Sequence, residues 1–269
     1  MLKFIGLGLY DEKGLSILGL EEAKNSDIVF AEFYTSFMPG LSLNRLENLI
    51  GKPIQILSRK DVEERDEEII LKAAKEKDVA FLTPGDPMNA TTHIALRVKA
   101  EKMGIKTKLI HAASIFSAIA GATGLQSYKF GRSVSIPIAG KFSISEAPYN
   151  VVKTNKSLGL HTLVLLDLDV EAGAYLTVSE ALRQLLIVEE RKKENVINLN
   201  SFIIVVARLG GATMDVKSLL VKDALNQDFD GPPFSIVFPG KLHFMEAEAL
   251  QVLTGAKKEF LEENLNEKL

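Results

Sequence analysis

Three loops of the sequence combine glycine, aspartate and hydroxyl side chains in the manner of ligand-binding loops. The first is Gly6-Leu7-Gly8-Leu9-Tyr10-Asp11, which follows an apolar run at a place where missing side chains let a ligand approach the backbone. Because Asp11 stands where a dinucleotide-binding fingerprint has its third glycine, the loop does not complete that motif. The segment therefore indicates either a loop for close ligand approach or a tight exit from a strand.

The second loop, Thr83-Pro84-Gly85-Asp86-Pro87, presents one carboxylate on a stiff backbone. Its two prolines favour an extended or turned chain over a helix. A buried carboxylate costs free energy unless it is paired or hydrogen-bonded. Asp86 therefore either caps a helix that begins near Thr91 or binds a ligand hydroxyl.

The third loop, His111-Ala112-Ala113-Ser114-Ile115-Phe116, ends one strand and starts a helix. Ser114 stands in the position of an N-cap or first-turn residue. The free amides of such a helix start can hold a carboxylate, although plain capping is the more common role.

Several chemistries are excluded by residue counts. The chain has no cysteine, which removes disulfides, thiolate metal sites and cysteine nucleophiles. Its four histidines, at positions 93, 111, 161 and 243, form no metal-spaced pair, so we expect no metal site. No serine lies in a Gly-x-Ser-x-Gly elbow, so nucleophilic hydrolysis has no support.

The charge balance and the apolar runs bear on partners and location. The 32 basic and 35 acidic residues give a net charge of -3, which provides no global field to collect nucleic acid or anionic membrane. The apolar runs are far shorter than the roughly 20 residues of a membrane-spanning helix, and the N-terminus does not resemble a signal peptide. We expect a soluble cytoplasmic protein that binds neither nucleic acid nor membrane.

Short apolar runs alternate with amphipathic segments, which is typical of an α/β fold with buried sheets. The predicted strands are 2–5, 28–31, 53–57, 79–83, 107–111, 134–137, 161–168, 202–207 and 235–238. The predicted helices are 16–25, 42–50, 61–76, 91–103 and 178–194. Thr177 and Glu180 form a capping-box pattern at the start of the last helix.

Two α/β domains follow from this pattern. The segment from Gly121 to Arg132 holds three glycines and few long apolar runs, so we place the boundary after about residue 125. The predicted domains are then 1–125 and 126–269, and the cleft between two such domains is the default binding site.

Taken together, these loops resemble the ligand loops of the tetrapyrrole methylase superfamily, and within it the chain is similar to the diphthine synthase family. The segments that carry the resemblance to this family are Phe30-Ala31-Glu32-Phe33-Tyr34-Thr35-Ser36, Leu82–Pro87 with Ala90-Thr91-Thr92-His93, and Pro239-Gly240-Lys241-Leu242-His243 with Glu246-Ala247-Glu248. The resemblance runs from Met1 to about Gly255.

The resemblance implies a homodimer of two-domain α/β chains that binds S-adenosylmethionine in a cleft between the domains. By position, the implied cofactor contacts are Leu9, Asp86, Asn89, Ser114, Ile115, Leu166, Leu209 and Phe234. The implied reaction trimethylates the amine of a 2-(3-amino-3-carboxypropyl)histidine on translation elongation factor 2, and no metal is needed. Because deprotonating such an amine at pH 7 costs roughly 1–3 kcal/mol, a strong dedicated base is not demanded, and the sequence identifies none.

Two alternatives remain open at this level. A methyltransferase for uroporphyrinogen or precorrin would need several converging arginines to bind the many carboxylates of its substrate. The eight arginines of this chain are scattered along the sequence, and only Arg132 and Arg208 stand beside ligand loops. A non-catalytic nucleotide-binding module rests only on the incomplete glycine fingerprint.

Overall fold

Two units make up the computed structural model, which describes residues 1–138, 144–170 and 172–262. The N-terminal unit is Met1–Phe116 and the C-terminal unit is Ser117–Leu269. The predicted boundary lies after residue 125, whereas the units divide within the first turn of helix α6 (Ile115–Thr123). The residues of α6 from Ser117 onward belong to the C-terminal unit, and Gly124, directly after the helix, lies close to Ala249.

A parallel five-stranded sheet forms the centre of the N-terminal unit, in the order β3-β2-β4-β1-β5. The strands are β1 (Leu2–Gly6), β2 (Ile28–Glu32), β3 (Gln55–Leu57), β4 (Val79–Thr83) and β5 (Thr107–Ile110). Alternate side chains of β4 enter different cores: Val79 and Phe81 belong to one, Ala80 and Leu82 to the other. Both faces of the sheet are therefore buried, which explains why its strands read as continuous apolar runs.

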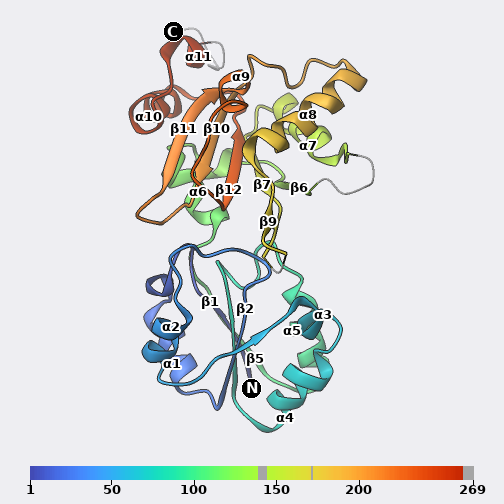
Figure 1. Cartoon of the computed structure of the whole chain (residues 1–269), viewed down its shortest axis with the longest axis vertical. Helices are drawn as coiled ribbons and strands as arrows, with labels where there is room; N and C mark the ends of the chain where they lie inside the picture. Colours follow the sequence, from blue (N-terminus) through green and yellow to red (C-terminus); the bar gives the residue numbers. More distant parts are fainter. Residues whose placement is uncertain (139–143, 171, 263–269) are drawn as a thin grey trace. The chain divides into compact units, whose positions relative to one another are not determined.

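Helices cover both faces of this sheet (Figure 1). Helices α1 (Ile17–Lys24) and α2 (Leu43–Ile50) lie on one face, and α3 (Arg59–Glu63), α4 (Lys72–Glu76) and α5 (His93–Lys102) on the other. The single helix predicted over 61–76 is divided: a Ser58–Asp61 capping box starts α3 earlier, and a π-helical turn at Glu67–Leu71 separates it from α4. A short 3-10 helix spans Glu12–Gly14.

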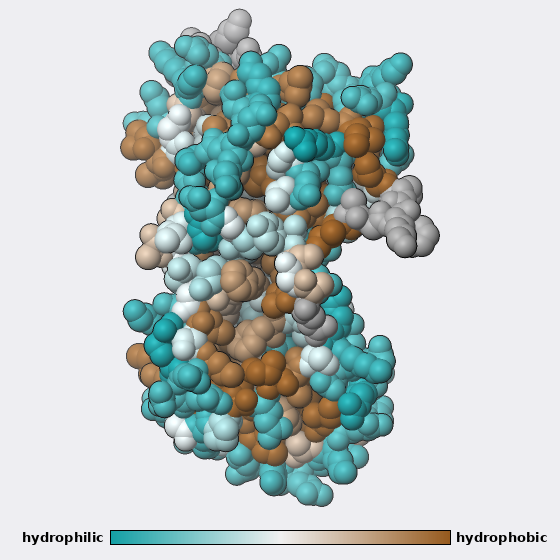
Figure 2. All heavy atoms as spheres, viewed as in Figure 1, coloured by the Kyte–Doolittle hydropathy of each residue, from teal (hydrophilic) through white to brown (hydrophobic). Residues whose placement is uncertain are grey.

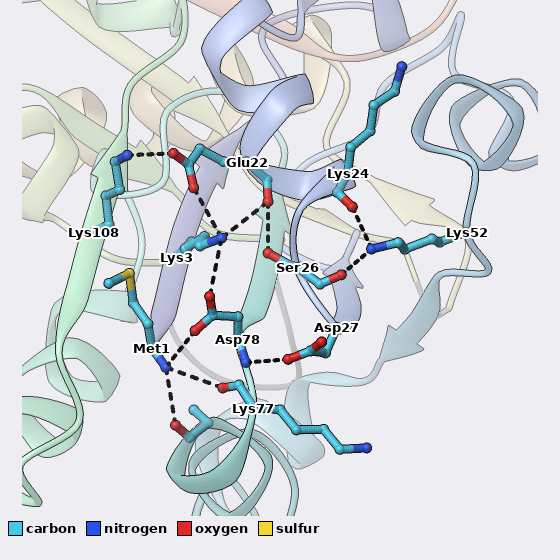
Figure 3. Close-up of polar contacts among 11 residues, drawn as sticks. Met1, Lys3, Glu22, Lys24, Ser26, Asp27, Lys52, Lys77, Asp78 and Lys108 are labelled. Atoms are coloured by element: carbon cyan, nitrogen blue, oxygen red, sulfur yellow. Dashed lines mark hydrogen bonds and ion pairs between the residues drawn. The ribbon is translucent and has the colours of Figure 1, made fainter.

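At the amino ends of these strands the charged groups bind one another (Figure 3). Lys3, whose side chain is only 4% exposed, contacts Glu22 at 3.0 Å, and Lys108 contacts the other oxygen of the same carboxylate. Lys52 donates to the backbone carbonyls of Lys24 and Ser26. These contacts form a polar network at the amino ends of the strands, and the network holds the helix ends to the sheet.

A mixed five-stranded sheet forms the centre of the C-terminal unit, in the order β11-β10-β12-β7-β6. The strands are β6 (Val134–Ile136), β7 (Thr162–Leu166), β10 (Phe202–Ala207), β11 (Asp215–Leu220) and β12 (Phe234–Phe238). The strand predicted over 161–168 ends at Leu166, and a two-stranded ribbon of β8 (Leu168–Asp169) and β9 (Ala174–Tyr175) follows. The strand β11 was not predicted.

The helices of this unit are α7 (Ala147–Ser157), α8 (Val178–Lys192), α9 (Val221–Ala224), α10 (Phe244–Thr254) and α11 (Lys258–Glu262), with a 3-10 turn at Ser127–Lys129. The capping box predicted for α8 is confirmed, since Thr177 accepts from the Glu180 amide and Glu180 accepts from the Thr177 amide. Helices α7 and α8 pack on one face of the sheet, and α10 lies on the other side (Figure 1).

Hydrophilic residues cover much of the outer helices, and apolar residues show between them (Figure 2). Within the part of the chain that is described, no helix is long and apolar enough to cross a membrane.

Candidate functional site

Three loops of the N-terminal unit meet where strands β1, β4 and β5 end. Gly8 and Gly85 exchange two backbone hydrogen bonds, of 3.1 and 2.7 Å, which tie the loop after β1 to the loop after β4. A Cβ on Gly6 would lie 2.5 Å from the Gly85 carbonyl oxygen and 2.7 Å from the Ala112 Cβ. Position 6 therefore requires glycine because two other loops close over the end of β1.

Asp86 ties the loop after β4 to the loop after β5. Its Oδ1 accepts the Met88 amide at 3.0 Å, and its Oδ2 lies 2.8 Å from Nδ1 of His111 and 3.4 Å from the Ala112 amide. Helix α5 begins at His93 with Thr92 in the N-cap position and no side-chain cap. The capping alternative for Asp86 is therefore wrong: its carboxylate, 5% exposed, binds the neighbouring loop instead.

A second contact joins the same two loops. The Asn89 side-chain amide donates to Oγ of Ser114 at 3.1 Å, and Ser114 directly precedes Ile115, the first residue of α6. Leu9 follows Gly8 in the loop after β1. Four of the five site residues predicted for this unit thus lie on three loops that are bonded to one another at one edge of the sheet, and the fifth, Ile115, begins the helix that follows.

The three site residues predicted in the C-terminal unit also share one sheet edge. Phe234 begins β12 and pairs with Ala207 of β10. Leu209 follows Ala207 by two residues. Leu166 ends β7, where its neighbour Leu165 pairs with Ser235. All three side chains are buried, so this edge presents apolar side chains beside strand ends.

Arg208 holds this second edge together. Its backbone has a φ of 51°, in the left-handed region, and its amide donates to the Pro233 carbonyl at 3.0 Å. The buried guanidinium donates to the carbonyls of Thr213, Gly231 and Phe229. The sequence indicated that Arg208 stands beside a ligand loop but did not predict which groups its side chain contacts. The structure assigns it to the turn that precedes Phe234.

A buried Glu32–His93 pair lies behind the loops of the N-terminal unit. The Nε2 atom of His93 is 3.8 Å from Oε1 of Glu32, and Nδ1 bonds to the Pro87 carbonyl at 3.3 Å. Burial raises the pKa of Glu32 to about 7, against the opposing effect of its hydrogen bonds from Thr35. Burial also lowers the pKa of His93 to about 4, so its imidazole is neutral at pH 7.

The C-terminal unit holds a second buried pair, His161 and Glu246. Their Nε2 and Oε1 atoms are 3.0 Å apart, and Nδ1 of His161 accepts the Gly240 amide at 3.0 Å. Burial alone would raise the pKa of Glu246. Hydrogen bonds from His161, the His243 amide, Lys129 and the Gln126 amide outweigh burial and bring the pKa to about 2. This carboxylate is therefore ionised.

The N-terminal loops and the C-terminal sheet edge offer different chemical groups. Among residues 1–138, 144–170 and 172–262, no three His, Asp or Glu side chains are grouped to hold a metal ion. The N-terminal loops offer backbone amides and carbonyls around glycines, and the C-terminal edge offers apolar side chains. Backbone groups around glycines allow a polar ligand to approach closely, and apolar side chains suit an apolar or aromatic group.

Comparison with known proteins identifies the family. Residues 1–222 match the family of Tetrapyrrole (Corrin/Porphyrin) Methylases. The chain is 48% identical over 257 residues to the diphthine synthase of Methanocella arvoryzae, covering 96% of this chain and 99% of that protein. It is 46% identical to the diphthine synthase of Methanocaldococcus jannaschii, covering 94% and 98%. A crystal structure of diphthine synthase matches with a TM-score of 0.86 at 38% identity, covering 97% and 98%.

These matches span nearly the full length of both chains, and they confirm the α/β fold and the resemblance seen in the sequence motifs. The chain belongs to the tetrapyrrole methylase family and, within it, groups with the diphthine synthases, which makes it a methyltransferase that uses a donor of the S-adenosylmethionine type.

Proposed function

We propose that this chain takes methyl groups from S-adenosylmethionine and places three of them on the amine of the 2-(3-amino-3-carboxypropyl)histidine of translation elongation factor 2. The observation that carries the proposal is the identity of 46 to 48% to diphthine synthases over nearly the whole chain. The proposal includes a cytoplasmic location and a homodimer, the commonest closed assembly.

The cofactor contacts proposed in the N-terminal unit are Leu9, Asp86, Asn89, Ser114 and Ile115. The two bridges Asp86–His111 and Asn89–Ser114 support this assignment, because they fix the backbone of both loops before any ligand arrives. A preorganised loop binds with less loss of conformational entropy. In the C-terminal unit, Leu166, Leu209 and Phe234 are the proposed apolar contacts, and Arg208 fixes the turn beside them.

Bound S-adenosylmethionine supplies an electrophilic methyl group next to a sulfonium charge. The chain's part is to hold donor and amine in line, since alignment of two reactants accounts for much of such a barrier reduction. Carbonyl dipoles of the bonded loops are suited to a positive charge that moves from sulfur to nitrogen. The amine itself must be neutral when it attacks.

The alternative with a tetrapyrrole substrate lacks the arginines that a polycarboxylate needs. Several arginines are engaged within the protein: Arg45 with Glu12, Arg65 with Asp61, Arg97 with Thr107, and Arg208 with carbonyl groups. A guanidinium already satisfied by protein acceptors has few donors left for a substrate carboxylate. This observation favours the protein-borne amine.

Mass spectrometry of elongation factor 2 after incubation with this protein and S-adenosylmethionine tests the proposal. We expect mass gains of one to three methyl groups on factor that carries the aminocarboxypropyl group, and none on factor with unmodified histidine. Methylation of uroporphyrinogen with no methylation of the modified factor would overturn it.

Binding and assembly are tested separately. S-adenosylhomocysteine at 100 times its dissociation constant should stabilise the fold by about 2.7 kcal/mol, whereas NAD and ATP should not. Light scattering at micromolar concentration should give the mass of two chains, and the mass of one chain would contradict the dimer.

A further inference from the structure

We propose that His111 is the proton acceptor for the substrate amine, with Asp86 orienting its ring. This inference rests on the proposed amine methylation and adds the base that the sequence did not identify. It starts from one contact: Nδ1 of His111 lies 2.8 Å from Oδ2 of Asp86.

That contact determines which ring nitrogen can take a proton. An ionised carboxylate only accepts hydrogen bonds, so the hydrogen of the neutral imidazole must lie on Nδ1. The other nitrogen, Nε2, then carries the lone pair. A carboxylate that holds a histidine in this tautomer is the arrangement by which histidine bases are oriented in hydrolases.

Exposure separates His111 from the other histidines. The His111 side chain is 68% exposed, whereas those of His93 and His161 are fully buried. His243 accepts the Met245 amide at the start of α10. Within the described residues no hydrogen bond engages Nε2 of His111, so this atom is open to a substrate and to water.

Loop support alone does not explain the His111 side chain. The loops after β4 and β5 are already joined by Asn89 and Ser114 at 3.1 Å, and Asp86 also binds the Ala112 amide. The loop after β1 is joined independently through Gly8 and Gly85. A base at this point stands three residues from Ser114, among the residues proposed to hold the methyl donor.

Each methyl transfer moves one proton to His111 and one methyl group to the amine. Nε2 takes one proton from the substrate ammonium, which becomes a neutral amine, and the imidazole becomes a cation stabilised by Asp86. The amine lone pair then forms the N–C bond while the C–S bond breaks and its electron pair stays on sulfur. The imidazolium returns its proton to water before the next transfer, for which its exposure is required.

The test compares wild type with His111→Gln across pH 6 to 9, using the modified elongation factor as substrate. At pH 7 we expect kcat to fall about 100-fold, the lower end of the range for general bases. The deficit should shrink towards pH 9, because an amine with a pKa of about 8 or more then loses its proton without help. His243→Gln serves as the matched control and should keep the wild-type profile.

Two further measurements separate a base from a loop support. Added imidazole should restore part of the activity of His111→Ala, which a missing loop contact would not allow. Calorimetry should show that His111→Gln loses far less affinity for S-adenosylhomocysteine than it loses in kcat, because the Asn89–Ser114 bond and the Ala112 amide still join the two loops. Equal kcat at all pH values, or a loss of affinity that matches the loss of kcat, would overturn the assignment. Wild type that transfers no methyl group at any pH would overturn the proposed function instead.

Discussion

The two units each bury one histidine against one glutamate, and the pKa of the glutamate is shifted in opposite directions in the two pairs. In the C-terminal unit the His161 and Glu246 atoms are 3.0 Å apart, and amide and lysine donors surround the carboxylate. In the N-terminal unit the Glu32 and His93 atoms are 3.8 Å apart, and the hydrogen bonds to the Glu32 carboxyl come from its chain neighbours Tyr34 and Thr35, with no lysine donor. Burial is nearly complete in both cases, so the number of donors decides whether the carboxyl is ionised.

The difference shows what each pair can contribute to stability. An ionised, fully hydrogen-bonded Glu246 joins the turn at Gln126, strand β7 through His161 and the start of α10. Removing one partner there leaves buried charges and donors unsatisfied. The Glu32–His93 pair carries little charge below pH 7, so its loss removes weaker contacts.

The largest effect is expected for Glu246→Ala. Truncation leaves Lys129 and His161 without their buried acceptor, and we expect the free energy of unfolding to fall by about 3–5 kcal/mol. Urea denaturation at pH 7 measures it. Glu248→Ala, an exposed position on the same helix, is the control and should stay within about 0.5 kcal/mol. A similar small change for Glu246→Ala would show that the network is not a stabilising contact.

The same substitution in both histidines compares the pairs directly. His161→Leu leaves the Glu246 carboxylate and the Gly240 amide each short of one partner, so we expect a loss of about 2–4 kcal/mol. His93→Leu removes one 3.3 Å hydrogen bond and a nitrogen with no hydrogen-bond partner among the described residues, so we expect about 1 kcal/mol. Thermal and urea unfolding of both variants should rank His161→Leu as the less stable. The reverse ranking would contradict the comparison.

Acid pH should weaken the C-terminal pair in a defined window. The pKa of Glu246 is about 2 in the fold and 4.5 ordinarily, so the unfolded chain binds more protons between these values. The contribution is complete above about pH 4.5 and is lost as pH falls towards 2. Denaturation curves from pH 2 to 5 should therefore show a shallower acid decline in Glu246→Gln than in wild type.

The smallest effect is expected for Glu32→Gln, within about 1 kcal/mol at pH 7, because an amide can replace a half-protonated carboxyl. With a folded pKa of about 7, Glu32 makes stability fall as pH rises from about 4.5 to 7. His93, whose pKa is lowered to about 4, makes stability rise between about pH 4 and 6.5. The variant should therefore gain stability more steeply than wild type from pH 4.5 to 6.5. An identical slope would contradict the raised pKa of Glu32.

Sequence patterns predicted the uniformly apolar strands well and missed elements without a clear apolar period. Phe202–Ala207 and Val79–Thr83 were predicted with the bounds observed, because both faces of these strands are covered and their residues are uniformly apolar. Strand β11, with the sequence Asp-Val-Lys-Ser-Leu-Leu, was missed because only its pairing with β10 defines it. Helix α10 was missed because its apolar residues lie on several sides, which weakens the helical period.

For the candidate site, the loops were found from the sequence and their contacts were not. Glycine, proline and aspartate at strand ends identified the loops containing Gly8 and Asp86, since these residue types restrict the backbone locally. Whether Asp86 caps a helix or binds the next loop depended on where His111 lies, 25 residues away. Arg208 was noticed only as a charge near a loop, because its carbonyl acceptors follow it in the chain by 5 to 23 residues.

The sequence by itself determined the α/β class, the positions of the three strand-end loops and the family, because these depend on local residue types and on ordered motifs. The tertiary structure alone decided the pKa shifts of the buried carboxyls Glu32 and Glu246 and the contact between His111 and Asp86. Those properties depend on distances of about 3 to 4 Å between residues far apart in the chain, such as His161 and Glu246, which are separated by 85 positions. A difference of under 1 Å in the distance between a nitrogen and an oxygen decides whether the two atoms form a hydrogen bond. The spacing of residues in a sequence does not specify that distance.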